Sequence, residues 1–171
     1  MPETKLLLPK FLTKETAEEA ILVAAKTVLT PPISLDIKRQ DFHIVVLVPK
    51  MVVEAGNYPN YPINPHLLAE YSQGDKKLWS RDYANIAQCK AIQRWYDRAD
   101  GGTDTRPHLL FQGDTPYWGS VKRYGVVVAC SGVQPYFDRM IAGIAADVMI
   151  GLAYHAWMGS LDKVNGSDFL T

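Results

Sequence analysis

Cysteine and histidine are scarce in this chain. Its 171 residues include two cysteines, Cys89 and Cys130, and four scattered histidines. Two isolated cysteines do not form the closely spaced pairs that structural zinc sites use, and a reducing compartment disfavours a disulfide between them. The sequence therefore predicts neither a disulfide framework nor a resident metal.

An excess of charge of one sign is also lacking. The 18 Lys and Arg residues balance the 18 Asp and Glu residues, which gives a formal net charge of zero. Without a basic stripe, nucleic acid is not an expected partner. The apolar run at residues 6–8 is broken by Pro9 and Lys10, so it is too short for a secretory leader, and no apolar run approaches the ~20 residues that span a bilayer. We predict a cytoplasmic protein with no membrane partner.

Several catalytic and nucleotide-binding motifs are absent. The sequence contains no glycine-rich phosphate loop, no Gly-x-Ser-x-Gly turn and no His-Glu-x-x-His helix. These absences argue against a nucleotide-dependent enzyme, a serine hydrolase of that type and a zinc protease. We expect no cofactor, with haem kept as an alternative.

Three helices are predicted from apolar periodicity. Thr13 is a good N-cap for a helix over 14–29, which ends before Pro31. A second helix covers about 82–98, and a third runs from near Pro135 to about Met158. The third is apolar on two sides, so one side should cover a sheet and the other a second layer or another subunit.

Strands are predicted from β-branched and alternating segments at 33–37, 43–48, 108–112, 117–119 and 121–129. The first two should pair as a hairpin. Proline and asparagine dominate residues 50–80, which we read as an irregular insertion with a short helix near 66–72. A glycine-rich loop follows at 100–104.

The segment SGVQPYFD, residues 131–138, links the last strand to the last helix. Gly132 permits an unusual turn, and Pro135 suits the first turn of a helix. Asp138 then lies where a carboxylate complements exposed N–H groups and the helix dipole. Its role as a structural cap and a direct ligand-binding or catalytic role both remain open.

Four segments together resemble the haem-degrading-type domain family that includes the GlcG and HbpS proteins. These segments are FLTKETAEEAILVAAKTVL for the first helix, ISLDIKRQDFHIVVLV for the first hairpin, ANIAQCKA with Lys90 in an Ala-x-x-Lys-Ala pattern, and SGVQPYFDRMIAGIAAD. The resemblance covers roughly residues 11–150. Departures include Lys38-Arg-Gln-Asp41 in place of the usual Asp-x-Gly-Gly turn, and the insertion at 50–80.

The resemblance implies an α+β fold of the profilin-like kind, with an antiparallel five-stranded sheet flanked by helices. It also implies a homo-oligomer. The length of 171 residues, without a convincing domain boundary, predicts one domain over residues 1–171. The departures lie where a ligand pocket could be reshaped, so the ligand of the family does not carry over to this chain.

The residues that could carry chemistry fall into two groups. His108 and Asp138 are the candidate acid–base pair, because histidine and carboxylate side chains transfer protons near neutral pH. Lys90 and Arg94, one helical turn apart, could clamp an anion. The other candidate ligand-binding residues are His43, Tyr117, Trp118 and Ser131.

Three functions remain open at this stage. The first is a cofactor-independent enzyme of the isomerase, cyclase or lyase type, acting by proton transfer on a small organic substrate. The second is a haem- or tetrapyrrole-binding protein with His43, His66 or His108 as an axial ligand. The third is a non-catalytic oligomeric accessory protein.

Overall fold

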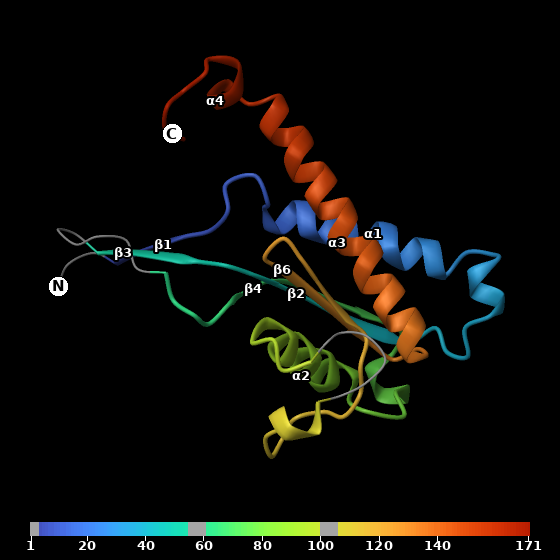
Figure 1. Cartoon of the computed structure of the whole chain (residues 1–171). Helices are drawn as coiled ribbons and strands as arrows, with labels where there is room; N and C mark the ends of the chain where they lie inside the picture. The colour runs from blue at the N-terminus through green and yellow to red at the C-terminus, as the bar shows by residue number, and fades with distance from the viewer. Residues whose placement is uncertain (1–3, 55–60, 100–105) are drawn as a thin grey trace.

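The chain forms an α+β structure, seen in a computed structural model that describes residues 4–54, 61–99 and 106–171 (Figure 1). Its strands are β1 (Thr4–Leu7), β2 (Phe42–Val48), β3 (Met51–Glu54), β4 (His66–Gln73), β5 (Ser120–Arg123) and β6 (Val126–Ser131). Its helices are α1 (Lys14–Val28), α2 (Tyr83–Trp95), α3 (Pro135–Met158) and the short α4 (Leu161–Val164). Single 3-10 turns occur at η1 (Ile33–Leu35), η2 (Lys76–Leu78) and η3 (Pro107–Leu109).

The central sheet has four antiparallel strands in the order β4-β2-β6-β5. Every residue of β2 is buried, which explains its unbroken apolar sequence. One face of the sheet, including Ile44 and Val46, packs against α1 and α3. The other face, including Val45 and Leu47, packs against α2. The sheet therefore lies between two helical layers (Figure 1).

The three helices predicted at 14–29, about 82–98 and 135–158 are confirmed, and local signals explain their starts. The Thr13 hydroxyl accepts a hydrogen bond from the Thr16 N–H at 3.2 Å, and the Asp82 carboxylate accepts one from the Asn85 N–H at 3.1 Å. α3 begins at Pro135, whose missing N–H would have no helical acceptor at that position. These starts depend on local signals, so they could be predicted from sequence.

α3 is longer than the sheet it covers, and its C-terminal part extends beyond the layers toward α4 (Figure 1). There Phe11 packs edge-on against Trp157, with ring centroids 5.4 Å apart, and Lys10 pairs with Asp162. By length and composition, α3 is the one helix within the described ranges that would suffice to cross a membrane. A core helix meets the same criterion, and Ile141, Ala145 and Met149 of α3 are fully buried.

The predicted strand at 33–37 is wrong, and so is its hairpin with 43–48. Residues 33–35 form the η1 turn instead, and β2 pairs with β4 and β6. Ile33 and Ile37 both pack against the core, while Leu35 is exposed. Apolar residues four apart fit a helical turn as well as a strand, so this segment was ambiguous in sequence.

The predicted helix near 66–72 is also wrong, because these residues form the edge strand β4. Pairing with β2 outweighs the local helical preference of His-Leu-Leu-Ala-Glu. Residues 108–112 and 117–119 form no strand; the first range overlaps η3 and the second precedes β5. The segment 121–129 belongs to a β5–β6 hairpin whose turn, Tyr124 and Gly125, has positive φ at both residues.

The predicted five-stranded sheet is corrected to four strands plus a separate two-stranded ribbon of β1 and β3. β3 follows β2 directly but pairs with the N-terminal strand, with Thr4 opposite Glu54. Of the predicted strands, only 43–48 and 121–129 contribute to the four-stranded sheet, as β2 and as β5 with β6, and β4 completes it. Part of the predicted insertion, residues 55–60, and the predicted loop at 100–104 lie outside the described residues.

Candidate functional site

A pocket of about 240 Å³ opens where β6 ends and α3 begins. Its lining joins the two helical layers, since it includes side chains from α2 and from the first turn of α3. The lining residues are Arg39, Arg81, Tyr83, Ile86, Lys90, Tyr117, Ser131, Gly132, Val133, Pro135 and Asp138. The pocket is smaller than the roughly 300–1,000 Å³ typical of drug-sized ligands, so it suits a small molecule.

A buried ion pair lies at this pocket. The Lys90 ammonium is 3.1 Å from Asp138 Oδ2 and also donates to the Cys130 carbonyl at 2.8 Å. The two side chains are only 2% and 3% exposed. A buried ion pair contributes little net stability, because desolvation offsets the Coulomb attraction. Its place beside an open pocket makes this ion pair a candidate for chemistry.

The surroundings of Asp138 act on its pKa in opposite directions. Burial raises the pKa of the Asp138 carboxyl, while the Lys90 ammonium and a hydrogen bond from the Val133 N–H at 3.0 Å act to lower it, and the net direction is upward. A carboxylate with a raised pKa is a stronger base than an ordinary carboxylate, which suits it to accept a proton. The structure thus combines the cap at the start of α3 and the potential proton acceptor in one side chain.

Two glycines allow the close approach of chain segments around the ion pair. At Gly119, with φ of +130°, an added Cβ would lie 2.6 Å from Asp138 Cβ and 3.1 Å from Lys90 Nζ. At Gly132, with φ of +137°, it would lie 2.2 Å from the Asp41 carbonyl oxygen. The unusual turn predicted at Gly132 is confirmed.

Four of the residues predicted to carry chemistry line this pocket together: Lys90, Asp138, Tyr117 and Ser131. They come from α2, α3, the segment before β5 and the end of β6. Trp118, next to Tyr117 in sequence, is half-buried and does not line the pocket. Cys130 is fully buried, and burial raises the pKa of its thiol well above the ordinary value, so it is not a reactive thiolate.

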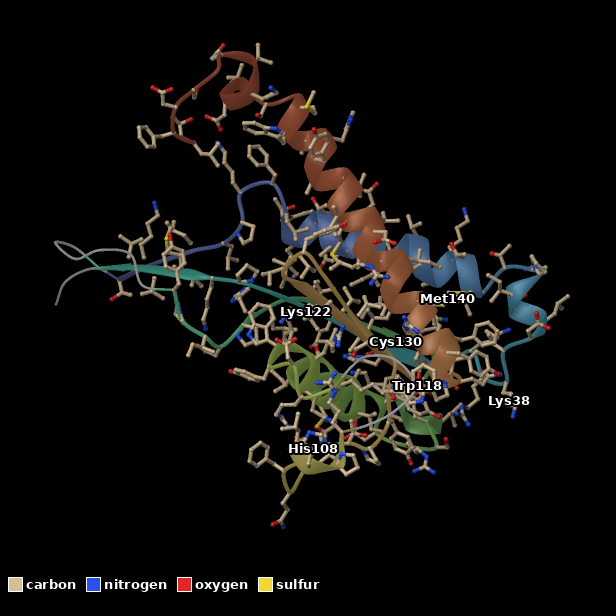
Figure 2. The ribbon with its side chains drawn as sticks, viewed as in Figure 1. Lys38, His108, Trp118, Lys122, Cys130 and Met140 are labelled. Atoms are coloured by element: carbon tan, nitrogen blue, oxygen red, sulfur yellow. The ribbon has the colours of Figure 1, made fainter. Side chains whose placement is uncertain are left out.

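The other predicted site residues lie elsewhere. His108 is exposed on η3, away from Cys130 on the sheet (Figure 2). Arg94 donates to the Ala99 carbonyl at 2.8 Å and does not line the pocket, so it forms no clamp with Lys90 there.

His43 is buried in β2, 2.7 Å from Ser72 Oγ and 3.3 Å from Glu70 Oε2. Burial lowers the pKa of His43, so its imidazole is neutral near pH 7.

Sequence reasoning missed Arg39, Arg81 and Tyr83 as pocket residues. Arg39 was assigned to a hairpin turn, and Arg81 precedes the cap of α2 without any motif. Tyr83 lies within the helix predicted at about 82–98, and nothing in the sequence marks it as a residue that borders a pocket. These three residues are recognised as pocket residues only because the fold brings their segments together in space.

The residues around the pocket do not fit haem. No histidine lines the pocket, and the nitrogens of His43 already contact Ser72 and Glu70. Iron can also take a tyrosine as its axial ligand, and Tyr83 and Tyr117 line the pocket, but a volume of about 240 Å³ is small for a macrocycle. Within residues 4–54, 61–99 and 106–171, no cluster of three metal-ligating side chains occurs.

No family model, curated protein or solved structure matches this chain. The resemblance to the haem-degrading-type domain family therefore stays a prediction.

Proposed function

We propose that this chain binds a small organic molecule in the pocket at the start of α3 and catalyses a cofactor-independent proton transfer on it. Isomerisation, elimination and cyclisation are reactions of this type. The observation that carries the proposal is the buried Lys90–Asp138 ion pair at an open pocket. Ionisable residues whose pKa is shifted by burial and by a nearby charge are common at functional sites. The absence of nucleotide-binding motifs from the sequence supports a reaction without a redox cofactor.

In this proposal Asp138 is the base. Its carboxylate takes a proton from the carbon next to a substrate carbonyl, and the C–H electron pair moves into an enolate. Lys90 stabilises the enolate oxygen. An ammonium has three N–H donors, and the Cys130 carbonyl and Asp138 account for two of them, which leaves one for the substrate. Asp138 then returns the proton to a neighbouring carbon, or a leaving group departs. His108 has no part, since it lies outside the pocket.

The test measures solvent exchange at carbon. We expect the protein in D₂O to exchange the protons next to the carbonyl of pyruvate, 2-oxoglutarate or phenylpyruvate faster than buffer does, as followed by proton NMR. Asp138→Asn should lower the protein-dependent rate by about 10²–10⁴-fold, the usual contribution of a positioned base. Asp168→Asn, a change at an exposed carboxylate near the C-terminus, should leave it unchanged.

Circular dichroism at the assay temperature checks that Asp138→Asn is folded. Exchange no faster than buffer with all three acids, or an unchanged rate in folded Asp138→Asn, would contradict the assignment of Asp138 as the base.

The element order supports the family resemblance as a proposal. The helix with the Thr13 cap, the helix carrying Lys90, the β5–β6 hairpin and the final helix follow one another as the resemblance implies, whereas the hairpin that it implies at 33–48 does not form. In place of that hairpin, β2 pairs with β4, which follows β3 in the chain. We propose a profilin-like arrangement on this basis.

We also propose that the chain forms a homodimer through α3. The outer side of this helix presents Arg139, Gly143 and Asp147 around a shallow hollow beside β5. Gly143 is midway between the two charged residues. In an antiparallel pair of α3 helices crossing at Gly143, Arg139 of each copy faces Asp147 of the other, and the small residue allows close approach. Each Arg139 then gains a carboxylate partner, in addition to the pair that Asp147 forms with Arg123 of its own chain.

Charge reversal tests this dimer. We expect light scattering to show a dimer for the wild type, a monomer for Arg139→Asp, in which like charges meet, and a restored dimer for Arg139→Asp combined with Asp147→Arg. Arg123 lies 3.5 Å from Asp147 within the chain, in an exposed pair that contributes little. A monomeric wild type, or a double variant that stays monomeric, would contradict the proposed interface.

A further inference from the structure

Two arginines at the pocket have no acidic partner. Among the residues that the structure describes, neither the Arg39 nor the Arg81 guanidinium forms an ion pair with a carboxylate. Arg39 donates through Nε to the Gly132 carbonyl at 2.8 Å, which leaves both of its terminal nitrogens. Because Asp138 balances the charge of Lys90, the pocket as a whole has an excess of two positive charges.

Both guanidiniums lie near tyrosine rings of the same pocket. Arg39 Cζ is 6.0 Å from the centre of the Tyr83 ring, and Arg81 Cζ is 5.5 Å from that of Tyr117. A guanidinium in this position keeps its N–H edge free for an anion. The contacts that hold each arginine at the pocket therefore include an aromatic ring and no carboxylate, and Arg39 also bonds the Gly132 carbonyl.

Apart from Ser131, the remaining wall is mostly apolar. Tyr83 is almost fully buried, and Ile86, Val133 and Pro135 also line the pocket. Apolar side chains with a few polar groups are typical of small-molecule sites. The pocket thus pairs cationic donors with aromatic and aliphatic surface, which fits a ligand that is anionic at one end and flat and apolar at the other.

We infer that the ligand is a small aromatic carboxylate, with its carboxylate on Arg39 and Arg81 and its ring against Tyr117 and Ile86. This inference rests on the proposed function, because it names the class of molecule that reaches Lys90 and Asp138. A planar guanidinium matches a carboxylate through paired N–H···O bonds. The volume of about 240 Å³ limits the ligand to about one ring. An aromatic 2-oxo acid such as phenylpyruvate meets both requirements.

The experiment compares benzoate with benzamide, which share their shape and differ in charge. By titration calorimetry at low ionic strength, we expect benzoate to bind at least tenfold more tightly than benzamide. Arg81→Gln should weaken benzoate binding about tenfold and leave benzamide binding unchanged, since it removes one charge-assisted contact. Arg81 is the better variant, because Arg39 also bonds the chain at Gly132. Arg106→Gln, at another exposed arginine outside the pocket, is the matched control.

The outcomes separate this inference from the proposed function. If benzamide binds as tightly as benzoate, or if Arg81→Gln leaves their affinity ratio unchanged, the carboxylate assignment is overturned. The proton-transfer proposal then still stands on the exchange assay with pyruvate and its Asp138→Asn variant. If exchange occurs while neither aromatic probe binds, the aromatic class is wrong and the reaction is retained. If there is neither exchange nor binding, both are overturned.

Discussion

Lys90→Met is expected to lower the free energy of unfolding by about 3–5 kcal/mol, as measured by urea denaturation followed by circular dichroism. The change removes the cation beside Asp138, whose carboxylate stays buried at 3% exposure. A buried charge without a partner carries its full desolvation cost. The Cys130 carbonyl also loses its hydrogen bond from Lys90.

Two comparisons make this result interpretable. Lys14→Met breaks an exposed pair with Glu18 at 3.7 Å and should cost less than about 1 kcal/mol. The double variant Lys90→Met with Asp138→Leu removes both charges and should recover a large part of the loss, since apolar replacements for buried pairs are often neutral. A loss for Lys90→Met as small as that for Lys14→Met would mean that Asp138 is uncharged in the folded protein.

Gly132→Ala is the second change with a large expected effect, a loss of about 3–5 kcal/mol from strain and steric overlap together. Alanine rarely adopts φ of +137°, and its Cβ would lie 2.2 Å from the Asp41 carbonyl oxygen and 2.7 Å from Phe42 Cα. Both are backbone atoms at the start of β2, so they cannot move aside as a flexible side chain would. Thermal and urea unfolding both report this loss.

Gly113→Ala is the matched control for this prediction. Gly113 also has positive φ, at +95°, but its added Cβ would meet nothing within 4 Å. Its cost should be about 1–2 kcal/mol, from backbone strain alone. Equal losses at Gly113 and Gly132 would show that contact with β2 contributes nothing, and the tight turn after β6 would need another explanation.

Those parts of the fold that depend on short-range signals could be predicted from the sequence. α1 and α3 match their predicted ranges because a capping threonine and a first-turn proline mark their starts. β4 could not be predicted, because its sequence also suits a helix and only pairing with β2 decides between them. The strand prediction at 33–37 was wrong for a related reason, since the apolar spacing of this segment fits a turn as well as a strand.

The site was predictable to the extent that its residues belong to recognisable patterns. Lys90 and Asp138 stood out from sequence segments, and the structure brings them within 3.1 Å of each other. Nothing in the sequence predicted that they would meet, because they lie in helices on opposite faces of the sheet. Arg39 and Arg81 carry no motif, and they become pocket residues only through the folding of distant segments.

The contact of Gly119 with both members of the ion pair limits how this chain can change over evolutionary time. A side chain at position 119 would meet Asp138 and Lys90 together, so a larger residue there requires a shorter or missing partner. Positions 90, 119 and 138 should therefore vary as a set among related chains. A relative without lysine at position 90 could also carry a larger residue than glycine at position 119. Replacement at both positions would identify relatives in which this pocket no longer has its ion pair.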